Sequence, residues 1–215
     1  KKFRYMGYVW SANTSQGLAA QVVVAGFLNY NLNEHFKFGL GINALPTTRS
    51  TMGNFPFWLG VDNRLIADEF FRGSFTTGAW VDGEIIKGLD YKVMLGNNLS
   101  QLGVDAGQLD NILDTWSFTL AWMPTTGEFG FNNAFGDYDN HQTLATRLAA
   151  HFTTSTEERQ SQPGTQDPDN VQVRLSDGSI IFTPGLFGEG ILVNDVNYNM
   201  FAFDAGVKYK GYALE

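Results

Sequence analysis

The sequence predicts an all-β fold, and within that class an antiparallel barrel whose strands cross a membrane. Three observations predict it. Segments in which apolar and polar residues alternate recur along the 215 residues, and such alternation indicates strands with one apolar face. Charged residues make up only 17% of the chain, beside a usual quarter. No apolar run approaches the ~18 to 20 residues that a membrane helix needs.

Eight segments alternate, and a ninth begins near the end of the chain. They span residues 1–10, 20–31, 35–43, 76–85, 89–96, 115–123, 143–153 and 199–209, and the ninth starts at Gly211. Most are about 8 to 11 residues long, the length that a tilted strand needs to cross a bilayer. Several apolar faces end in Tyr or Trp, as the aromatic girdles of membrane barrels do. A soluble sandwich also alternates, so the strands by themselves favour a membrane barrel only slightly.

The segment 35–43 shows the choice between these two folds. Phe36, Phe38, Leu40 and Ile42 share one face, and Lys37, Gly39, Gly41 and Asn43 share the other. In a soluble sheet the apolar face packs inward and the lysine meets water. In a membrane barrel the apolar face meets lipid and the Lys/Gly face lines the lumen. The glycines would then leave room in the lumen or let a loop approach closely.

The connections favour the membrane barrel. Short turns are predicted at 31–35, at 86–88 with Gly88 in a left-handed conformation, and at 210–211. Long connections are predicted at 44–74, 98–114 and 154–197, and loops this long are uncommon in a compact domain. Outer-membrane barrels alternate short periplasmic turns with long outer loops in this way. The stretch 124–141 breaks the pattern, because a short turn is expected there, and it is predicted to hold a short extra element.

Composition and motifs argue against several other functions. The net charge of −8 disfavours nucleic-acid binding, and the absence of Cys excludes disulfides and thiolate sites. No nucleophile-elbow motif occurs, and the three histidines lack metal-ligand spacing. The acidic stretches 136–140 and 166–170 could hold Ca²⁺, but solvated loop carboxylates are the favoured interpretation. We therefore expect no catalytic, cofactor or metal site.

The charges on the polar faces of the strands are the candidate functional residues. In a soluble sheet these charges would form the solvent-exposed face. In a barrel they would line a water-filled pore and set its ion selectivity. The predicted pore-lining residues are Lys37, Arg49, Arg64, Arg72, Asp82, Glu84, Lys92, Arg147, His151, Asp204 and Lys208. Arg49, Arg64 and Arg72 belong to the long connection after the third strand. They line the pore only if that connection folds inward, and they are ordinary surface charges if it caps the outside.

Several stretches resemble the phosphate-selective porin O and P family of Gram-negative outer membranes. They are FLNYNLNEHFKFGLGINALPTTRS, VDNRLIADEFFRGSFTTGAWVDGEIIKGLDYKVMLGNN, GDYDNHQTLATRLAAHFTTSTEERQSQP, NVQVRLSDGS and FDAGVKYKGYALE. The resemblance covers nearly all of the chain through many loose motifs. It implies a barrel of about sixteen strands, a homotrimer in the outer membrane, and passive passage of small hydrophilic solutes or anions, phosphate among them. Residues 1–215 would then be one barrel domain, as an internal fragment of a longer chain.

One departure from that family concerns the solute. The phosphate-selective members line the pore with rows of Arg and Lys, whereas the predicted lumen face here mixes both signs and the chain is acidic. Phosphate specificity is therefore not expected to carry over.

The sequence leads to a passive outer-membrane porin as the predicted function. Two alternatives stay open. One is a soluble β-sandwich that binds a glycan or a partner protein, with the Phe and Leu residues as its core. The other is a barrel that does not conduct and serves as a subunit of an envelope complex. An enzyme is the class with the least support.

Overall fold

A computed structural model describes residues 2–13, 20–52, 75–97, 99, 112–130, 134–160, 170 and 173–215. Its strands are β1 (Phe3–Asn13), β2 (Ala20–Asn31), β3 (Lys37–Ala44), β4 (Phe75–Ile86), β5 (Leu89–Gly96), β6 (Thr115–Trp122), β7 (Ala145–Glu158), β8 (Asp195–Tyr209) and β9 (Tyr212–Leu214). A four-residue helix, α1 (Arg49–Met52), follows β3. The predicted all-β class is confirmed, and each predicted strand segment contributes a strand. Within the described residues, no helix is long and apolar enough to cross a membrane.

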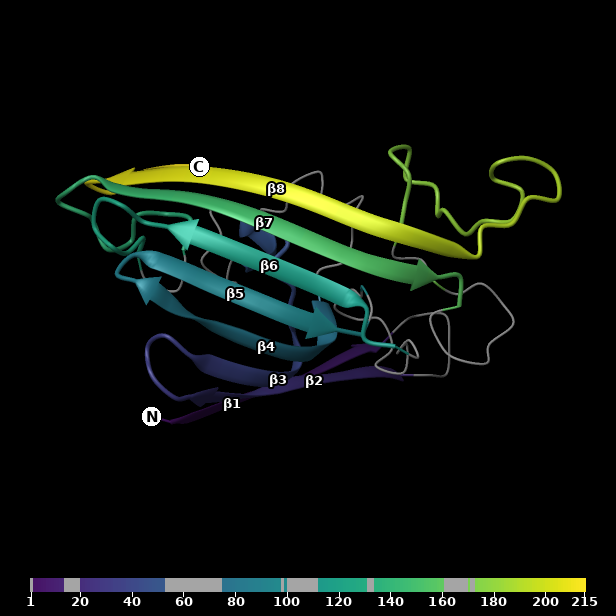
Figure 1. Cartoon of the computed structure of the whole chain (residues 1–215), viewed down its shortest axis with the longest axis horizontal. Helices are drawn as coiled ribbons and strands as arrows, with labels where there is room; N and C mark the ends of the chain where they lie inside the picture. Colours follow the sequence, from purple (N-terminus) through teal and green to yellow (C-terminus); the bar gives the residue numbers. More distant parts are fainter. Residues whose placement is uncertain are drawn as a thin grey trace.

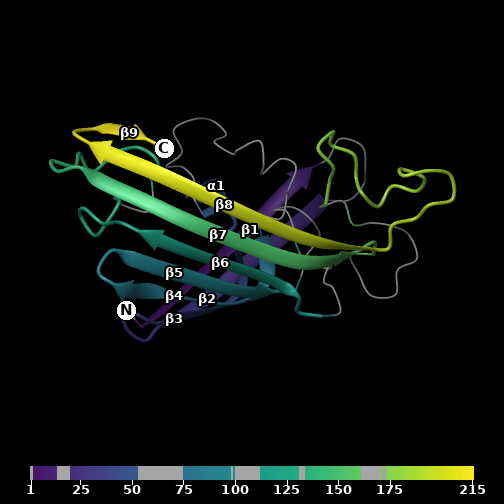
Figure 2. The same ribbon diagram turned by 45° about the horizontal axis from the view of Figure 1, so that its top comes forward.

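The nine strands form one antiparallel sheet in sequence order, so each strand pairs with the next one along the chain (Figure 1). The sheet is curved and twisted, and α1 lies against one side of it (Figure 2). It is not closed within the described residues, where β1 and β9 form its two edges. We call the side that faces α1 the inner face and the opposite side the outer face.

The register places apolar side chains beside one another across the outer face. One row runs from β1 to β8 through Phe3, Tyr30, Phe38, Val81, Val93, Phe118, Phe152 and Phe201. Ring centroids of neighbours in the row are 4.9 Å apart for Phe3 and Tyr30 and 4.7 Å apart for Phe152 and Phe201. Phe38 keeps 43% of its surface exposed and Phe201 keeps 69%. The apolar face of the sheet is therefore its uncovered face.

The inner face is polar in its middle and is largely covered. The row next to the apolar one contains Lys37, Asp82, Lys92, Thr119 and His151. On β6 and β7 the inner residues are buried in strict alternation with exposed or half-buried outer ones. The two faces of the sheet thus reverse the arrangement of a soluble sheet, in which the apolar side is the covered one.

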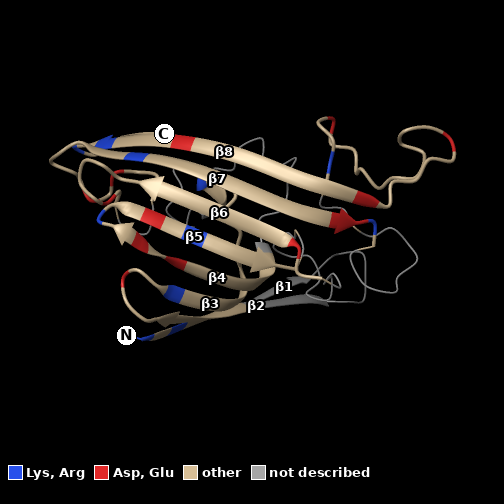
Figure 3. Cartoon of the chain, in the orientation of Figure 1, with Lys and Arg blue, Asp and Glu red and all other residues tan. Residues whose placement is uncertain are grey.

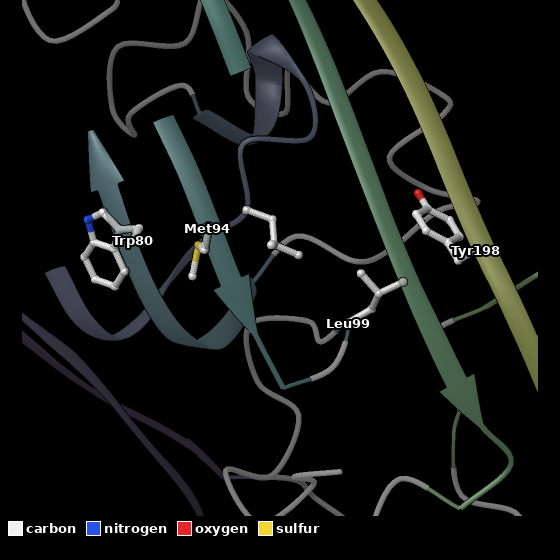
Figure 4. Packing of buried hydrophobic residues seen from close by; sticks show 5 residues of the cluster. Trp80, Met94, Leu99 and Tyr198 are labelled. Atoms are coloured by element: carbon white, nitrogen blue, oxygen red, sulfur yellow. The ribbon is translucent and has the colours of Figure 1, made fainter. Parts of the chain in front are cut away.

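An apolar cluster occupies the inner face toward the end with the long connections (Figure 4). It consists of Leu45, Trp80, Met94, Leu99 and Tyr198, each at most 5% exposed. Gly39 is required there, because a Cβ atom on Gly39 would collide with the indole of Trp80. Gly39 therefore makes room for a neighbouring side chain, and not for the open lumen or loop that the sequence suggested.

The short turns lie at one end of the sheet, and the turn at 210–211 agrees in detail with prediction. Tyr209 pairs with Tyr212, so the last hairpin turns through Lys210 and Gly211, both at positive φ. Gly88 is left-handed, with φ of 80°. The predicted three-residue turn at 86–88 was too long by one residue. Ile86 pairs with Leu89 after an irregularity near Ile85, so the turn is 87–88.

Two connections differ from the predicted ones. β7 and β8 extend further than the alternation indicated, so their connection is 159–194. The prediction of a short extra element in 124–141 was wrong for the part of this stretch that the structure describes, which contains no helix or strand. Instead, the connection between β6 and β7, residues 123–144, folds back onto the inner face. Its own residues Phe129, Ala134 and Phe135 are buried. This connection is long because it covers part of the inner face of the sheet.

Candidate pore-lining surface

The predicted pore-lining residues that the structure describes lie on the inner face or on segments that cover it. Charged residues of β3, β4, β5, β7 and β8 lie toward the turn end of the sheet, and acidic residues of β7 and β8 also lie at the opposite end (Figure 3). Arg64 and Arg72 lie outside the described residues. Arg49 is only 5% exposed and belongs to a segment that contacts the inner face, so it is not an ordinary surface charge. That it lines a pore stays a prediction.

The segment 45–52 reaches the inner face through its backbone. Lys92 Nζ donates to the carbonyl of Ala44 at 3.0 Å, and Thr119 Oγ1 donates to the carbonyl of Pro46 at 2.8 Å. His151 Nδ1 lies 3.1 Å from the same Pro46 oxygen. Thr119 of β6 thus donates to a carbonyl of the segment 45–52, and His151 of β7 lies beside the same carbonyl. Lys92 of β5 binds the carbonyl of Ala44, which directly precedes the segment. These contacts hold the segment 45–52 against the inner face of the sheet.

The guanidinium of Arg49 is enclosed by groups from distant parts of the chain. Its Nη2 donates to Glu215 Oε1 at 3.0 Å and to the carbonyl of Ala134 at 3.1 Å. Its Cζ lies 4.6 Å from the ring centroid of Phe135, within range of a cation–π interaction. The charge is therefore neutralised inside the protein.

Asp204 on β8 connects two buried basic side chains of the neighbouring strand β7. Arg147 Nη1 donates to its Oδ1, and His151 Nε2 lies 2.6 Å from its Oδ2. Arg147 is 5% exposed and His151 is 3% exposed. Through Thr119 and Pro46, this chain of contacts also links β8 to the segment 45–52.

Lys208 is the most buried charged side chain of β8, at 1% exposure. Its Nζ donates to the carbonyls of Phe129 and Ala134 at 2.7 and 2.6 Å and lies 4.4 Å from the Phe129 ring centroid. The ammonium therefore binds the connection between β6 and β7 and is enclosed by it.

Pairs of hydroxyl groups join β6 and β7 on the inner face, and none of these residues is among the predicted pore-lining ones. Thr115 and Ser155 are 2.7 Å apart at their hydroxyl oxygens, and so are Ser117 and Thr153. These four residues are at most 2% exposed. The alternation of β6 predicts Thr115 and Ser117 on the polar face, although neither is among the predicted pore-lining residues. Hydrogen bonding between neighbours could have been predicted from the same pattern.

An open recess lies at the turn end of the inner face. Its volume is about 250 Å³, and it is lined by Glu34, Lys37, Glu84, Asp90, Met123 and residues 127–130. We call it the turn-end recess. Four of its side chains are carboxylates, including that of Glu128, and Lys37 supplies one ammonium group. Among the predicted residues, the recess brings together Lys37 and Glu84.

A second missed feature is the buried pair of Asp137 and His141 in the 123–144 connection. The favoured interpretation of 136–140 as solvated carboxylates was wrong for Asp137, which is 8% exposed and contacts His141 Nδ1. Glu128 Oε1 accepts from the other ring nitrogen at 2.8 Å. The spacing of four residues between Asp and His was the available signal.

The surroundings shift the pKa values of this pair in opposite directions. Burial favours neutral Asp137, but hydrogen bonds from His141 and from the backbone N–H of Gly211 outweigh it and lower its pKa. Burial likewise favours neutral His141, but hydrogen bonds to Asp137 and Glu128 outweigh it and raise its pKa. Both shifts favour the ionic form of the pair, and Asp137 ties the connection to the β8–β9 turn through the N–H of Gly211.

Two further observations bear on what the surface can do. Among the described residues, no group of three or more His, Cys, Asp or Glu side chains has a geometry that could hold a metal ion. Comparison with known proteins found no matching family model, no matching curated protein and no matching solved structure.

Proposed function

We propose that the chain forms part of the wall of an outer-membrane β-barrel porin, which lets small hydrophilic solutes or anions pass without catalysis. The observation that carries the proposal is the reversal of the two faces. Aromatic and aliphatic side chains are uncovered across the outer face, while Arg147, His151 and Lys208 are enclosed on the inner one. Water penalises an apolar surface of this extent, whereas lipid accommodates it.

The layout of the chain supports the same proposal. Successive antiparallel strands in sequence order, short turns at one end and long connections at the other are the plan of outer-membrane barrels. The turn end would then face the periplasm. The resemblance of the sequence to the phosphate-selective porin O and P family supports a Gram-negative outer membrane and a homotrimer, both of which are part of the proposal.

A non-conducting barrel is the second candidate, and one observation favours it. Leu45 and Leu99 come from connections and pack against Trp80, Met94 and Tyr198 on the inner face, so part of the interior is filled at that level. A soluble β-sandwich has less support, because its predicted core residues, such as Phe38 and Leu40, are exposed.

Reconstitution of the full-length protein tests the two candidates. Stable conductance steps in a planar bilayer are expected from a porin. Folded protein that inserts into liposomes but never conducts would favour the non-conducting barrel. A folded protein that stays in solution without detergent would contradict both.

A further inference from the structure

We propose that Glu157 is a proton-dependent clamp, which holds two long connections against the inner face while its carboxyl group is neutral and loosens them when that group ionises. Glu157 lies on β7, at the end of the sheet away from the short turns (Figure 1). The proposal adds a regulatory element to the proposed barrel and does not depend on conductance, because a non-conducting barrel would carry the same clamp.

Glu157 joins two connections and two strands. Its Oε1 accepts from the backbone N–H of Leu99 at 2.9 Å and from the hydroxyl of Ser155 at 2.7 Å. Its Oε2 accepts from the side-chain amide of Asn170 at 3.0 Å. Leu99 belongs to the connection between β5 and β6, and Asn170 belongs to the connection between β7 and β8. Ser155 also contacts Thr115 on β6. One carboxyl group therefore fixes a point of each connection to the sheet.

This carboxyl group is buried without a basic partner. Glu157 is 1% exposed, and its three hydrogen-bond donors are uncharged. Among the described residues, no Lys, Arg or His side chain forms an ion pair with it. An ionised carboxylate in this place loses its hydration without gaining an opposite charge, so burial favours the neutral acid. The hydroxyl of Ser155 suits that form too, because a hydroxyl can accept a hydrogen bond as well as donate one.

This end of β7 lies beyond the apolar part of the outer face. The last apolar pair on the outer face of β7 and β8 is Phe152 with Phe201. The next outer pairs are all polar, namely Thr154 with Asn199, Thr156 with Asn197 and Glu158 with Asp195. The lipid-facing band of a membrane barrel is apolar. Under the proposed function, Glu157 therefore lies outside the membrane-spanning part of β7, where protons from the solution can reach its surroundings.

The charged groups around Glu157 do not favour its ionised form. Asp114, in the connection between β5 and β6, acts on it with a like charge. Glu158 and Asp195 lie opposite each other on the outer face, and Arg159, which follows β7, forms no ion pair with Glu157. Burial raises the pKa of Glu157 from an ordinary 4.5 to about 7, against the opposing effect of its three hydrogen bonds. The group therefore titrates close to neutral pH.

The direction of the pH effect follows from this raised pKa. When a connection detaches, Glu157 meets water and its pKa returns toward 4.5. The attached state thus binds the proton more tightly, and its advantage is complete below about pH 4.5 and is lost as pH rises to about 7. Leu99 belongs to the apolar cluster that fills part of the inner face (Figure 4). Raising the pH through this window should therefore loosen that cluster.

Hydrogen exchange of the full-length protein, folded in detergent, tests the clamp. The readout is the protection factor of peptides that contain Leu99, which removes the intrinsic pH dependence of exchange. Between about pH 5 and 7.5, protection in the unchanged protein should fall by about tenfold to hundredfold. Glu157→Gln mimics the neutral acid, so its protection should stay constant over this range. Glu158→Gln changes the neighbouring glutamate on the outer face and is the matched control, which should keep the pH dependence of the unchanged protein.

Two results would overturn the clamp. One is protection at Leu99 that does not fall with pH in the unchanged protein, and this result needs no variant to fold. The other is an unaltered pH dependence in Glu157→Gln, whose folding is checked by circular dichroism and heat-modified gel mobility. Conductance is not part of this readout, so a failure of the proposed porin function is seen separately, in the planar bilayer.

Discussion

The two faces of the sheet differ in what holds their side chains in place. On the outer face, Phe38, Phe118 and Phe201 touch neighbours within the row and are otherwise uncovered. On the inner face, Asp204, Thr119 and Lys208 each contact residues from another strand or connection. The outer face therefore depends on its surroundings for stability, whereas the inner face carries its own partners. Substitutions on the two faces should fail for different reasons.

The largest effect is expected from a charge on the outer face. Phe38→Lys would place an ammonium in the middle of the apolar row, which costs about 2 to 4 kcal/mol at the bilayer midplane. We expect failure of membrane assembly, measured as loss of the heat-modifiable band in outer-membrane fractions. Phe38→Leu is the matched control and should assemble. Normal assembly of Phe38→Lys would contradict the assignment of this face to lipid.

Removal of Asp204 should give the next largest effect. Asp204→Ala leaves the Arg147 guanidinium and His151 without their shared carboxylate, and breaking a buried ion pair costs about 3 to 5 kcal/mol. The upper part of that range is not expected, because Asp204 is 19% exposed. Denaturant unfolding in detergent measures the loss. Asp204→Asn keeps a hydrogen-bond acceptor and should lose less, and equal losses would mean that the charge is unimportant.

A single hydroxyl of the inner face should matter less. Thr119→Val removes the donor to the Pro46 carbonyl while it keeps the shape of the side chain. A lost hydrogen bond of this kind costs about 1 kcal/mol, and hydrogen exchange of the segment 45–52 should increase. Thr77→Val, on the outer face of β4, is the control and should leave that exchange unaltered. Unchanged exchange in both variants would show that the segment is held by other contacts.

The smallest expected effect is a pH dependence of the 123–144 connection. The raised pKa of His141 adds stability that is complete below its ordinary value of 6.5 and is lost as pH rises through the raised value. The lowered pKa of Asp137 adds stability that is present above its ordinary value of 3.8 and is lost as pH falls through the lowered value. Between these limits both contributions are present.

Comparison with a His141→Gln variant isolates this contribution from that of other carboxylates. The difference in exchange protection of residues 134–144 between the two proteins should be greatest between about pH 4 and 6.5. It should decrease on either side. A difference that grows steadily with increasing pH would contradict the ionic pairing of Asp137 and His141.

The amino-acid sequence by itself determined the strands and the character of their two faces. Alternation is a local property, because successive side chains of a strand point to opposite sides whatever the strand pairs with. Phe38 and Lys37 could therefore be placed on opposite faces before any tertiary contact was known. The turn at Lys210 and Gly211 is local for the same reason, since two residues at positive φ suffice to make it.

Only the tertiary structure decided how the inner face is covered. Arg49 lies inside because Thr119 donates to the Pro46 carbonyl of the segment that carries it, His151 lies against the same oxygen, and Lys92 binds the carbonyl of Ala44 directly before that segment. The 123–144 connection returns to the sheet because Lys208 binds two of its carbonyls. These contacts join residues far apart in the chain, and no local pattern encodes them. The same contacts determine which charged groups of the inner face are enclosed.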